Sequence, residues 1–232
     1  MNLKVCFAST GSAVVAMALA GAQTVGTTPT DAFVLANAAN QACTRTASSQ
    51  SITVKVARQG DVWITTNRSN WGRHSSGTQC RLYDVAYGNG VFVAVGNEGT
   101  LVTSADGARW TVRNSRTDER LRGVAFGNGT FVAVGYEGTV ITSGKGIRWV
   151  RRSSGTRERL QMVVFDRGIF VAVGWNGVIL TSATGSRWIV RKSDTSERLD
   201  GVAYRGGVFV ATVTNRAVLV SSDGLAWSLP SR

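Results

Sequence analysis

Apolar positions along this chain fall into short runs that are separated by glycine or polar turns, and the runs recur in a fixed order. In one clear unit, four such runs span residues 121–126, 131–135, 139–143 and 148–153. The turns between them are rich in glycine, which adopts the positive φ that tight hairpin turns require. A helix would lose about 1 kcal/mol at each interior glycine relative to alanine. The pattern therefore predicts four short antiparallel strands per unit.

The units repeat every 39 residues without insertion or deletion. Five tryptophans mark this register: Trp71, Trp110, Trp149, Trp188 and Trp227. The clearest copies of the block that precedes them are Leu82–Gly99, Leu121–Gly138, Leu160–Gly177 and Leu199–Arg216. Self-similarity at a fixed period of this length is typical of repeat architectures.

The second run of each unit is apolar on both faces, as Phe131, Val132, Ala133 and Val134 show. A sheet with two apolar faces needs a neighbour on each side, and radial stacking supplies both. We therefore expect an all-β fold, a five-bladed β-propeller of four-stranded antiparallel blades. A linear β-solenoid is the alternative. The blades are expected at about 42–79, 80–118, 119–157, 158–196 and 197–232.

The first unit is the least regular, because residues 42–51 lack the usual leucine and aromatic residue. No spare strand follows Trp227 that could complete the first blade. We expect a ring that closes without a strand swap in a monomer. The alternative is an open ring that a second chain completes.

The first 22 residues have the pattern of an export signal, with Lys4 ahead of an apolar run from Ala13 to Ala20. Small residues predict cleavage after Ala20 or Ala22, which leaves residues 23–41 as a flexible arm. A buried N-terminal helix is the alternative. The apolar run is too short to span a bilayer. We therefore predict a secreted or periplasmic protein with no transmembrane segment after cleavage.

Cleavage would leave two cysteines, Cys43 and Cys80. In an exported chain such a pair is a candidate disulfide, and it would link neighbouring repeats. Two free buried thiols are the alternative.

The chain of 232 residues has 43% hydrophobic residues and a formal net charge of +12. This charge attracts anions, which include nucleic acid, anionic glycan and an acidic protein face. A basic surface that only maintains solubility is the alternative reading. Predicted export disfavours nucleic acid as the partner.

Arginines recur with the repeat. One set precedes the tryptophans and another follows them by three positions: Arg109, Arg148, Arg187, then Arg113, Arg152, Arg191. Side chains four apart on a strand share a face, so we expect these six to form an anion-binding belt. Solvated arginines that prevent edge-to-edge aggregation are the alternative.

A further arginine stands before the leucine that opens each block: Arg81, Arg120, Arg159 and Arg198. Three of them have a neighbouring glutamate, namely Glu119, Glu158 and Glu197, for which we expect ion pairs between blades.

Two units carry the pattern Ser-x-Asp-Gly-x-x-Trp. Its members are Ser104, Asp106, Gly107 and Trp110 in one unit, and Ser221, Asp223, Gly224 and Trp227 in the other. The motif resembles the short variant of the Asp-box, or BNR, repeat of sialidase-like β-propellers, and is similar to that of photosystem II assembly-factor propellers. Other units depart from it at Asn67, Arg68, Lys145 and Thr184. The resemblance implies a fold more than a chemistry.

Sialidases use a singular set of arginines, a tyrosine and acids, whereas the acids here do not stand out from the repeat. The candidates are Glu98, Glu137, Asp84, Asp166 and Asp200. The single histidine, His74, aligns with Arg113 and so belongs to the repeated basic set. One histidine provides no ligand set for a metal ion. No cofactor motif is recognised either.

We therefore expect a non-enzymatic exported scaffold for an anionic or protein partner. A lectin-like propeller is an alternative, in which Tyr136 and Trp175 stack on sugar rings. A sialidase-like glycoside hydrolase is a more remote one.

Overall fold

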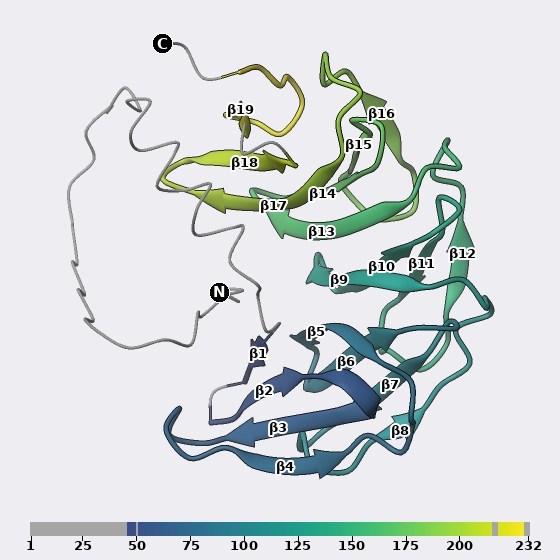
Figure 1. The fold of residues 1–232 in the computed structure, drawn as a ribbon, viewed down its shortest axis with the longest axis vertical. Coiled ribbons are helices and arrows are strands. Elements are labelled where there is room, and N and C mark those ends of the chain that lie inside the picture. Colours follow the sequence, from purple (N-terminus) through teal and green to yellow (C-terminus); the bar gives the residue numbers. More distant parts are fainter. Residues whose placement is uncertain (1–45, 50, 215–217, 230–232) are drawn as a thin grey trace.

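The computed structural model describes residues 46–49, 51–214 and 218–229 of the chain. These residues form five antiparallel sheets in which the strands lie side by side in sequence order. Figure 1 shows the sheets, here called blades 1 to 5, fanned around an arc with blades 1 and 5 at its ends. The predicted all-β, five-bladed propeller architecture is confirmed. Within the described ranges, no helix is long and apolar enough to cross a membrane.

The strands recur with the repeat. Blade 1 contains β1 (Thr46–Ser48), β2 (Thr53–Val56), the short 3-10 helix η1 (Arg58–Gly60), β3 (Asp61–Thr65) and β4 (Gly72–Ser75). Blade 2 contains β5 (Leu82–Gly88), β6 (Val91–Gly96), β7 (Leu101–Ser104) and β8 (Thr111–Val112). Blade 3 contains β9 (Leu121–Gly127), β10 (Thr130–Gly135), β11 (Val140–Ser143) and β12 (Val150–Arg152). Blade 4 contains β13 (Leu160–Asp166), β14 (Ile169–Gly174), β15 (Ile179–Ser182) and β16 (Ile189–Arg191). Blade 5 contains β17 (Leu199–Arg205), β18 (Val208–Val213) and β19 (Val218–Ser221).

The fourth strand is where the blades differ most from the expected pattern. In blade 3 it begins at Val150 and not at Arg148, because the indole N–H of Trp149 turns back to donate to the carbonyl oxygen of Gly146. In blade 5 it is reduced to a single antiparallel bridge between Val220 and Ser228. The last described sheet therefore has three strands.

The hairpin turns have the backbone conformation that their glycines predict. Between β9 and β10, Asn128 and Gly129 have φ values of 45° and 70°, and Thr130 pairs with Gly127 across the turn. Two successive positive φ values match the twist of the flanking strands.

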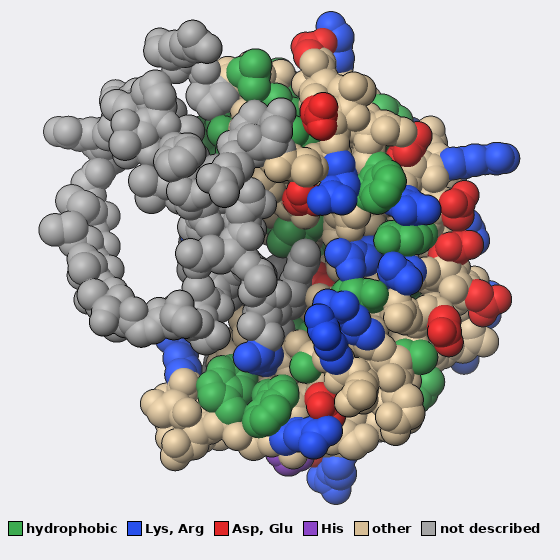
Figure 2. All heavy atoms as spheres, viewed as in Figure 1, with side chains coloured by type: hydrophobic (Ala, Val, Ile, Leu, Met, Phe, Trp, Pro, Cys, Tyr) green, Lys and Arg blue, Asp and Glu red, His purple; other side chains and the backbone are tan. Residues whose placement is uncertain are grey.

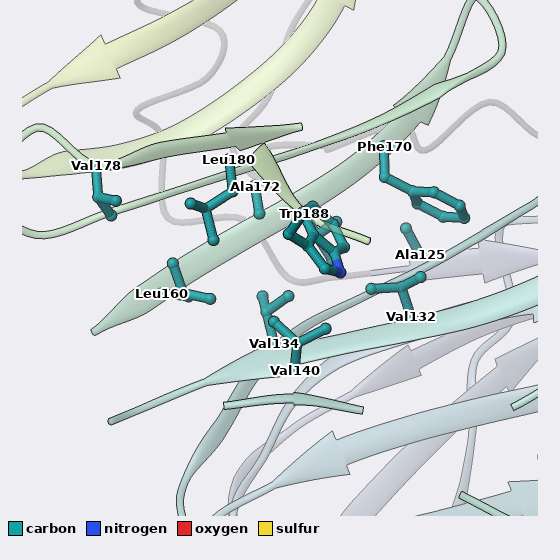
Figure 3. Close-up of a cluster of buried hydrophobic side chains, with 11 residues drawn as sticks. Ala125, Val132, Val134, Val140, Leu160, Phe170, Ala172, Val178, Leu180 and Trp188 are labelled. Carbon is teal, nitrogen blue, oxygen red and sulfur yellow. The ribbon is translucent and has the colours of Figure 1, made fainter. Parts of the chain in front are cut away.

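Neighbouring blades are held together by apolar packing. We call the face of a blade toward the preceding blade its backward face, and the opposite one its forward face. Between blades 3 and 4, Val132, Val134 and Val140 of the forward face meet the backward face of blade 4, as Figure 3 shows. That backward face contributes Leu160, Phe170, Ala172, Leu180 and Trp188. The same set of positions recurs at the other three interfaces between consecutive blades.

Three aromatic rings line up within each of blades 2 to 5. In blade 3, the centre of the Phe131 ring lies 4.6 Å from that of Phe126 and 6.5 Å from that of Trp149. Phe131 is 0% exposed and Trp149 is 1% exposed. These tilted arrangements are favoured by the ring quadrupoles and add to the gain from burial.

Hydrogen bonds also join blades where their first strands lie side by side, at the inner edge of the arc. The buried carboxylate of Asp84 accepts bonds from the backbone N–H of Val85, at 2.9 Å, and of Val124 in the next blade, at 2.8 Å. Two units further along the arc, between blades 4 and 5, the Met162 sulfur accepts the N–H of Val202 at 3.3 Å. The inner strands are therefore tied together as well as packed.

The two ends of the arc are not joined by a described apolar cluster. Four clusters span consecutive blades, and a fifth contains only Val208, Val210, Val218 and Val220 of blade 5. Closure between blade 5 and blade 1 stays a prediction.

Replacing Phe131 with alanine is expected to lower the free energy of unfolding by about 3–5 kcal/mol, because the ring is fully buried between two blades. Val150→Ala is the control, since Val150 is 47% exposed and should change stability by only about 0.5 kcal/mol. Urea denaturation measures both variants. Similar losses in the two would contradict the packing described.

Candidate functional site

One end of the blades, which we call the arginine face, carries the turn between the second and third strands. In blade 3 the N–H of Tyr136 donates to the carbonyl oxygen of Arg120 at 2.9 Å, and the N–H of Thr139 donates to that of Tyr136 at 2.9 Å. Between them Glu137 and Gly138 have φ values of 51° and 60°. This tight turn holds the aromatic side chain beside the arginine that opens the blade.

Glycine is required just before this turn. A Cβ atom at Gly135 would lie 2.1 Å from the carbonyl oxygen of Arg120, far inside van der Waals contact. The same is true of Gly96 against Arg81, at 2.3 Å, and of Gly174 against Arg159, at 2.1 Å. The repeated glycine therefore allows the close approach that places each arginine.

Arginine and aromatic side chains alternate across the arginine face. The Arg120 guanidinium lies 4.9 Å from the centre of the Tyr136 ring, and that of Arg159 lies 4.7 Å from it. Arg159 also lies 4.5 Å from the Trp175 ring, and Arg198 lies 5.8 Å from that ring. Such cation–π contacts are worth about 0.5–1 kcal/mol each at exposed sites.

The alternation continues toward blade 2 through Tyr83. Its ring has Arg122 at 4.3 Å, Arg81 at 4.9 Å and Arg120 at 5.8 Å from the centre. We call the whole set the arginine ladder: Arg81, Tyr83, Arg120, Arg122, Tyr136, Arg159, Trp175 and Arg198. It crosses blades 2 to 5 without interruption.

Polar contacts fix parts of the ladder. Arg122 donates from Nε to Gln161 Oε1 of the next blade at 3.0 Å, and Arg120 donates to the Tyr136 hydroxyl at 3.2 Å. Arg198 forms an ion pair of 2.6 Å with Asp200. The indole nitrogen of Trp175 is buried and finds no hydrogen-bond partner among the described residues. The ladder thus presents several cationic groups and one unused donor.

The space-filling view agrees with these contacts. Figure 2 looks at the arc from the same side as Figure 1, and Lys and Arg side chains alternate there with apolar or aromatic ones along the inner part of the face. Acidic side chains lie mostly nearer the outer edge. The inner part of this face is therefore suited to an anionic, partly apolar ligand.

Sequence analysis identified the parts of the ladder but not their assembly. It singled out the opening arginines and, separately, Tyr136 and Trp175, whereas Tyr83 and Arg122 were not predicted as site residues. The missed signal is hairpin register: Gly135, just before Tyr136, pairs with Leu121, just after Arg120. That pairing places an arginine beside the turn aromatic in each blade.

The six arginines predicted as an anion-binding belt fall into two sets with different surroundings. Arg113, Arg152 and Arg191 donate from Nε to threonine hydroxyls of the third strand, at 2.9, 3.0 and 2.8 Å. Arg109, Arg148 and Arg187 precede the fourth strand, at its opposite end, in exposed turns. Anion binding by these two sets stays a prediction.

The expected ion pairs of Glu119, Glu158 and Glu197 are not found in the described part of the chain, where Arg198, for example, pairs with Asp200. Instead, the backbone carbonyl oxygen of each glutamate accepts the N–H of a turn glycine: Gly99 at 3.0 Å, Gly138 at 3.0 Å and Gly177 at 2.8 Å. Their contribution to the ladder is through the backbone.

Of the predicted disulfide, Cys43 lies outside the described residues. Cys80 is a half-buried thiol 3.8 Å from Glu98 Oε2. His74 is exposed on β4 at the edge of blade 1. In the described residues, no group of three or more His, Cys, Asp or Glu side chains could hold a metal ion.

The two Ser-x-Asp-Gly-x-x-Trp motifs, called boxes below, lie at the end of the blades opposite the arginine face. Asp106 Oδ1 accepts the N–H groups of Ala108 at 2.9 Å and Arg109 at 2.8 Å, together with the Ser104 hydroxyl at 3.0 Å. The indole of Trp110 donates to the carbonyl oxygen of Gly107. Ser221, Asp223, Gly224 and Trp227 repeat the arrangement in blade 5. The motif therefore closes a turn.

The boxes that lack aspartate keep parts of this geometry. In blade 1, Asn67 Oδ1 accepts the N–H of Ser69 at 3.0 Å and of Asn70 at 2.9 Å. In blades 3 and 4, Trp149 and Trp188 still donate to Gly146 and Gly185. The hydrogen bonds from backbone N–H groups hold the pKa of Asp106 well below its usual range, first through the N–H of Arg109. The pKa of Asp223 is lowered in the same way by the N–H groups of Leu225 and Ala226.

Neither a protein-family model nor a curated protein matches this chain. Solved structures do match its fold. The computationally designed protein Ika8 has 15% sequence identity and a TM-score of 0.64, over 80% of this chain and 59% of that one. This chain thus spans about three fifths of the length of that neighbour.

Two structures of YCF48 are also similar. YCF48 from Cyanidioschyzon merolae has 16% identity and a TM-score of 0.58, over 77% of this chain and 68% of that one. YCF48 bound to D1 peptide has 18% identity and a TM-score of 0.59, over 78% and 64%. At these identities the likeness shows the fold alone.

Asp106→Asn is expected to make stability less dependent on acid pH. A carboxyl group whose pKa is lowered by folding stabilises the folded state above its unfolded pKa, and this contribution is lost as pH falls between about 5 and 2. Asparagine can keep the backbone bonds, as Asn67 does. Urea unfolding across this pH range should show the wild type losing its advantage over the variant. A gap that stays constant with pH would contradict the assignment, and Asp223→Asn should behave alike.

Proposed function

We propose that this chain is a non-enzymatic binding or assembly scaffold that holds an extended, carboxylate-bearing protein segment along the arginine ladder. The observation that carries this proposal is the uninterrupted run of arginine–aromatic contacts over four blades. A single sugar or small molecule would use only a fraction of such a surface.

The chemistry of the ladder suits a peptide. Guanidinium groups recognise carboxylates with two parallel hydrogen bonds, and they stack on aromatic planes at the same time. Arg159 and Arg198 are exposed, so their remaining N–H groups can reach a ligand. The half-buried rings of Tyr136 and Trp175 offer apolar surface between these charges. A solved propeller of similar fold is bound to a peptide, which supports this class of ligand.

The alternatives fit the contacts less well. For a lectin, Tyr136 and Trp175 would have to stack on sugar rings, yet each already has two guanidinium groups within 6 Å of its centre. A glycoside hydrolase would need two acids that converge on the substrate. Of the five candidate acids, Asp84 binds backbone N–H groups and Asp200 pairs with Arg198. The fold neighbour YCF48, one structure of which is bound to D1 peptide, also supports a binding function.

The place of action is part of the proposal. The signal-like pattern of residues 1–22 supports a function outside the cytoplasm, secreted or periplasmic. In that compartment the partner is a carboxylate-bearing protein segment.

The double variant Arg120→Gln/Arg159→Gln is expected to weaken binding of acidic peptides by at least about tenfold, or 1.4 kcal/mol. Both side chains belong to the ladder, so their loss removes two cationic contacts with the ligand. Fluorescence anisotropy measures this with labelled peptides graded in carboxylate content, at low and at moderate salt.

The matched control is Arg148→Gln/Arg187→Gln, which makes the same change in net charge at the opposite end of the blades. It should leave the affinity within about twofold at moderate salt, where distant charges are screened. Equal losses in both double variants would mean that net charge, and not the ladder, binds the peptide.

A further inference from the structure

The arginine ladder changes its chemistry at blade 5. The turn position that holds Tyr136 in blade 3 and Trp175 in blade 4 holds Thr214 in blade 5. The Thr214 hydroxyl donates to the backbone carbonyl oxygen of Arg198 at 3.1 Å, so this turn contributes a hydrogen bond where the others contribute a ring. Among the described residues, Arg198 therefore contacts one ring only, that of Trp175 in the preceding blade.

Arg198 also differs from the other opening arginines in having a carboxylate partner. Asp200 Oδ1 lies 2.6 Å from Nε of Arg198, and Asp200 Oδ2 lies 3.2 Å from the Thr214 hydroxyl. Within the described residues, no ion pair is found for the three others, Arg81, Arg120 and Arg159. The positive charge at blade 5 is thus neutralised from within the chain, whereas the charges at blades 2 to 4 are not.

The carboxylate comes from a position that differs in every blade. The second residue of the first strand is Tyr83 in blade 2, Arg122 in blade 3, Gln161 in blade 4 and Asp200 in blade 5. Along the arc this position therefore goes from an aromatic and a cationic group, through a neutral amide, to an anion. Because the repeat makes the blades alike at most other positions, this one gives the ladder two unlike ends.

We propose that Asp200 is a specificity-determining residue that ends the acid-binding part of the ladder at blade 5. A bound segment then places its carboxylates over blades 2 to 4 and uncharged or basic residues over blade 5. This inference rests on the function proposed above. A ligand carboxylate at Arg198 would compete with Asp200 for one guanidinium group and would lie beside a like charge, which disfavours it. The remaining N–H groups of Arg198 can still donate to uncharged carbonyl oxygens.

The inference concerns the order of acidic residues in the partner and not only their number. The net charge of +12 attracts any acidic segment over a long range. This attraction depends on how many carboxylates the segment has and hardly on where they stand. Asp200 acts at hydrogen-bond distance, so it makes the affinity depend on which end of the segment is acidic.

Peptides of identical composition test this dependence on order. Each contains four glutamates and four glutamines and has blocked ends, and eight extended residues span about 26 Å. The glutamates are consecutive in two segregated peptides, one for each order, and they alternate with glutamine in a third. At about 0.15 M salt, where distant charges are screened, the better segregated peptide should bind the wild type at least about threefold more tightly than the alternating one.

Asp200→Asn should remove this preference. It leaves Arg198 without its anionic partner, while the asparagine oxygen can keep the bond from Thr214. The alternating peptide should bind about fivefold more tightly than it binds the wild type, and the segregated peptides should gain much less. The matched control is Glu137→Gln, which removes one negative charge from an exposed turn of the same face. Glu137 has no ion pair in the described residues, so this variant should keep the preference.

Equal binding of the segregated and alternating peptides by the wild type would overturn the inference while the proposed function stands. A preference that is as large in Asp200→Asn as in Glu137→Gln would overturn it as well. If none of the peptides binds at this salt concentration, the proposed function itself fails and the inference fails with it. A preference that Asp200→Asn abolishes and Glu137→Gln retains supports the assignment of Asp200.

Discussion

The insertion of one phenylalanine from each of blades 2 to 5 into the aliphatic forward face of the blade before it is the contact on which the rest of this structure depends. Phe92, Phe131, Phe170 and Phe209 are all fully buried there. Each ring is held by two further aromatic side chains of its own blade. Because the contact joins only consecutive blades, stability is a sum of blade terms and interface terms.

This packing also determines where the polar groups lie. Strand order and hairpin register place the turns of the Ser-x-Asp-Gly-x-x-Trp motifs at one end of the blades. The arginines that precede the first strand of each of blades 2 to 5 lie at the other end. At the first of these ends, the motif residues close turns, and the indole N–H of each motif tryptophan donates to the glycine carbonyl oxygen of its turn. The arginine face is left with charged and aromatic side chains at the spacing of the blades. Structural support and ligand binding are thus separated between the two ends.

Much of the fold could be predicted because the strict 39-residue period repeats each local sequence pattern several times, so that every copy supports the same structural assignment. The tryptophan register, the glycine turns and the two apolar faces of residues 131–134 all indicated stacked sheets. The ladder could not be predicted in the same way. Its contacts join residues that are near one another only through hairpin register, as with Arg120 and Tyr136, or through blade packing, as with Arg120 and Tyr83.

Spacing along a strand also did not predict the contacts of the other arginines. Arg109 and Arg113 are four positions apart, which suggests a shared face, but the strand between them is only two residues long. Arg113 then bonds Thr103 while Arg109 pairs with Asp106 in the turn. The side chain of Arg109 is 92% exposed, so nothing else orders it. At the ends of such short strands, the alternation of side chains between the two faces of a sheet is a weak guide to which side chains lie together.

The unbroken spacing of the tryptophans has a consequence for how such chains change over generations. The spacing is uniform and each blade packs only against its neighbours. Duplication or loss of any 39-residue stretch therefore preserves the packing between the remaining blades. Recombination between the repeated coding segments can therefore lengthen or shorten the arc by whole blades. Only the two outermost blades limit this freedom, since a new terminal blade would have to take over the outer face of blade 1 or of blade 5.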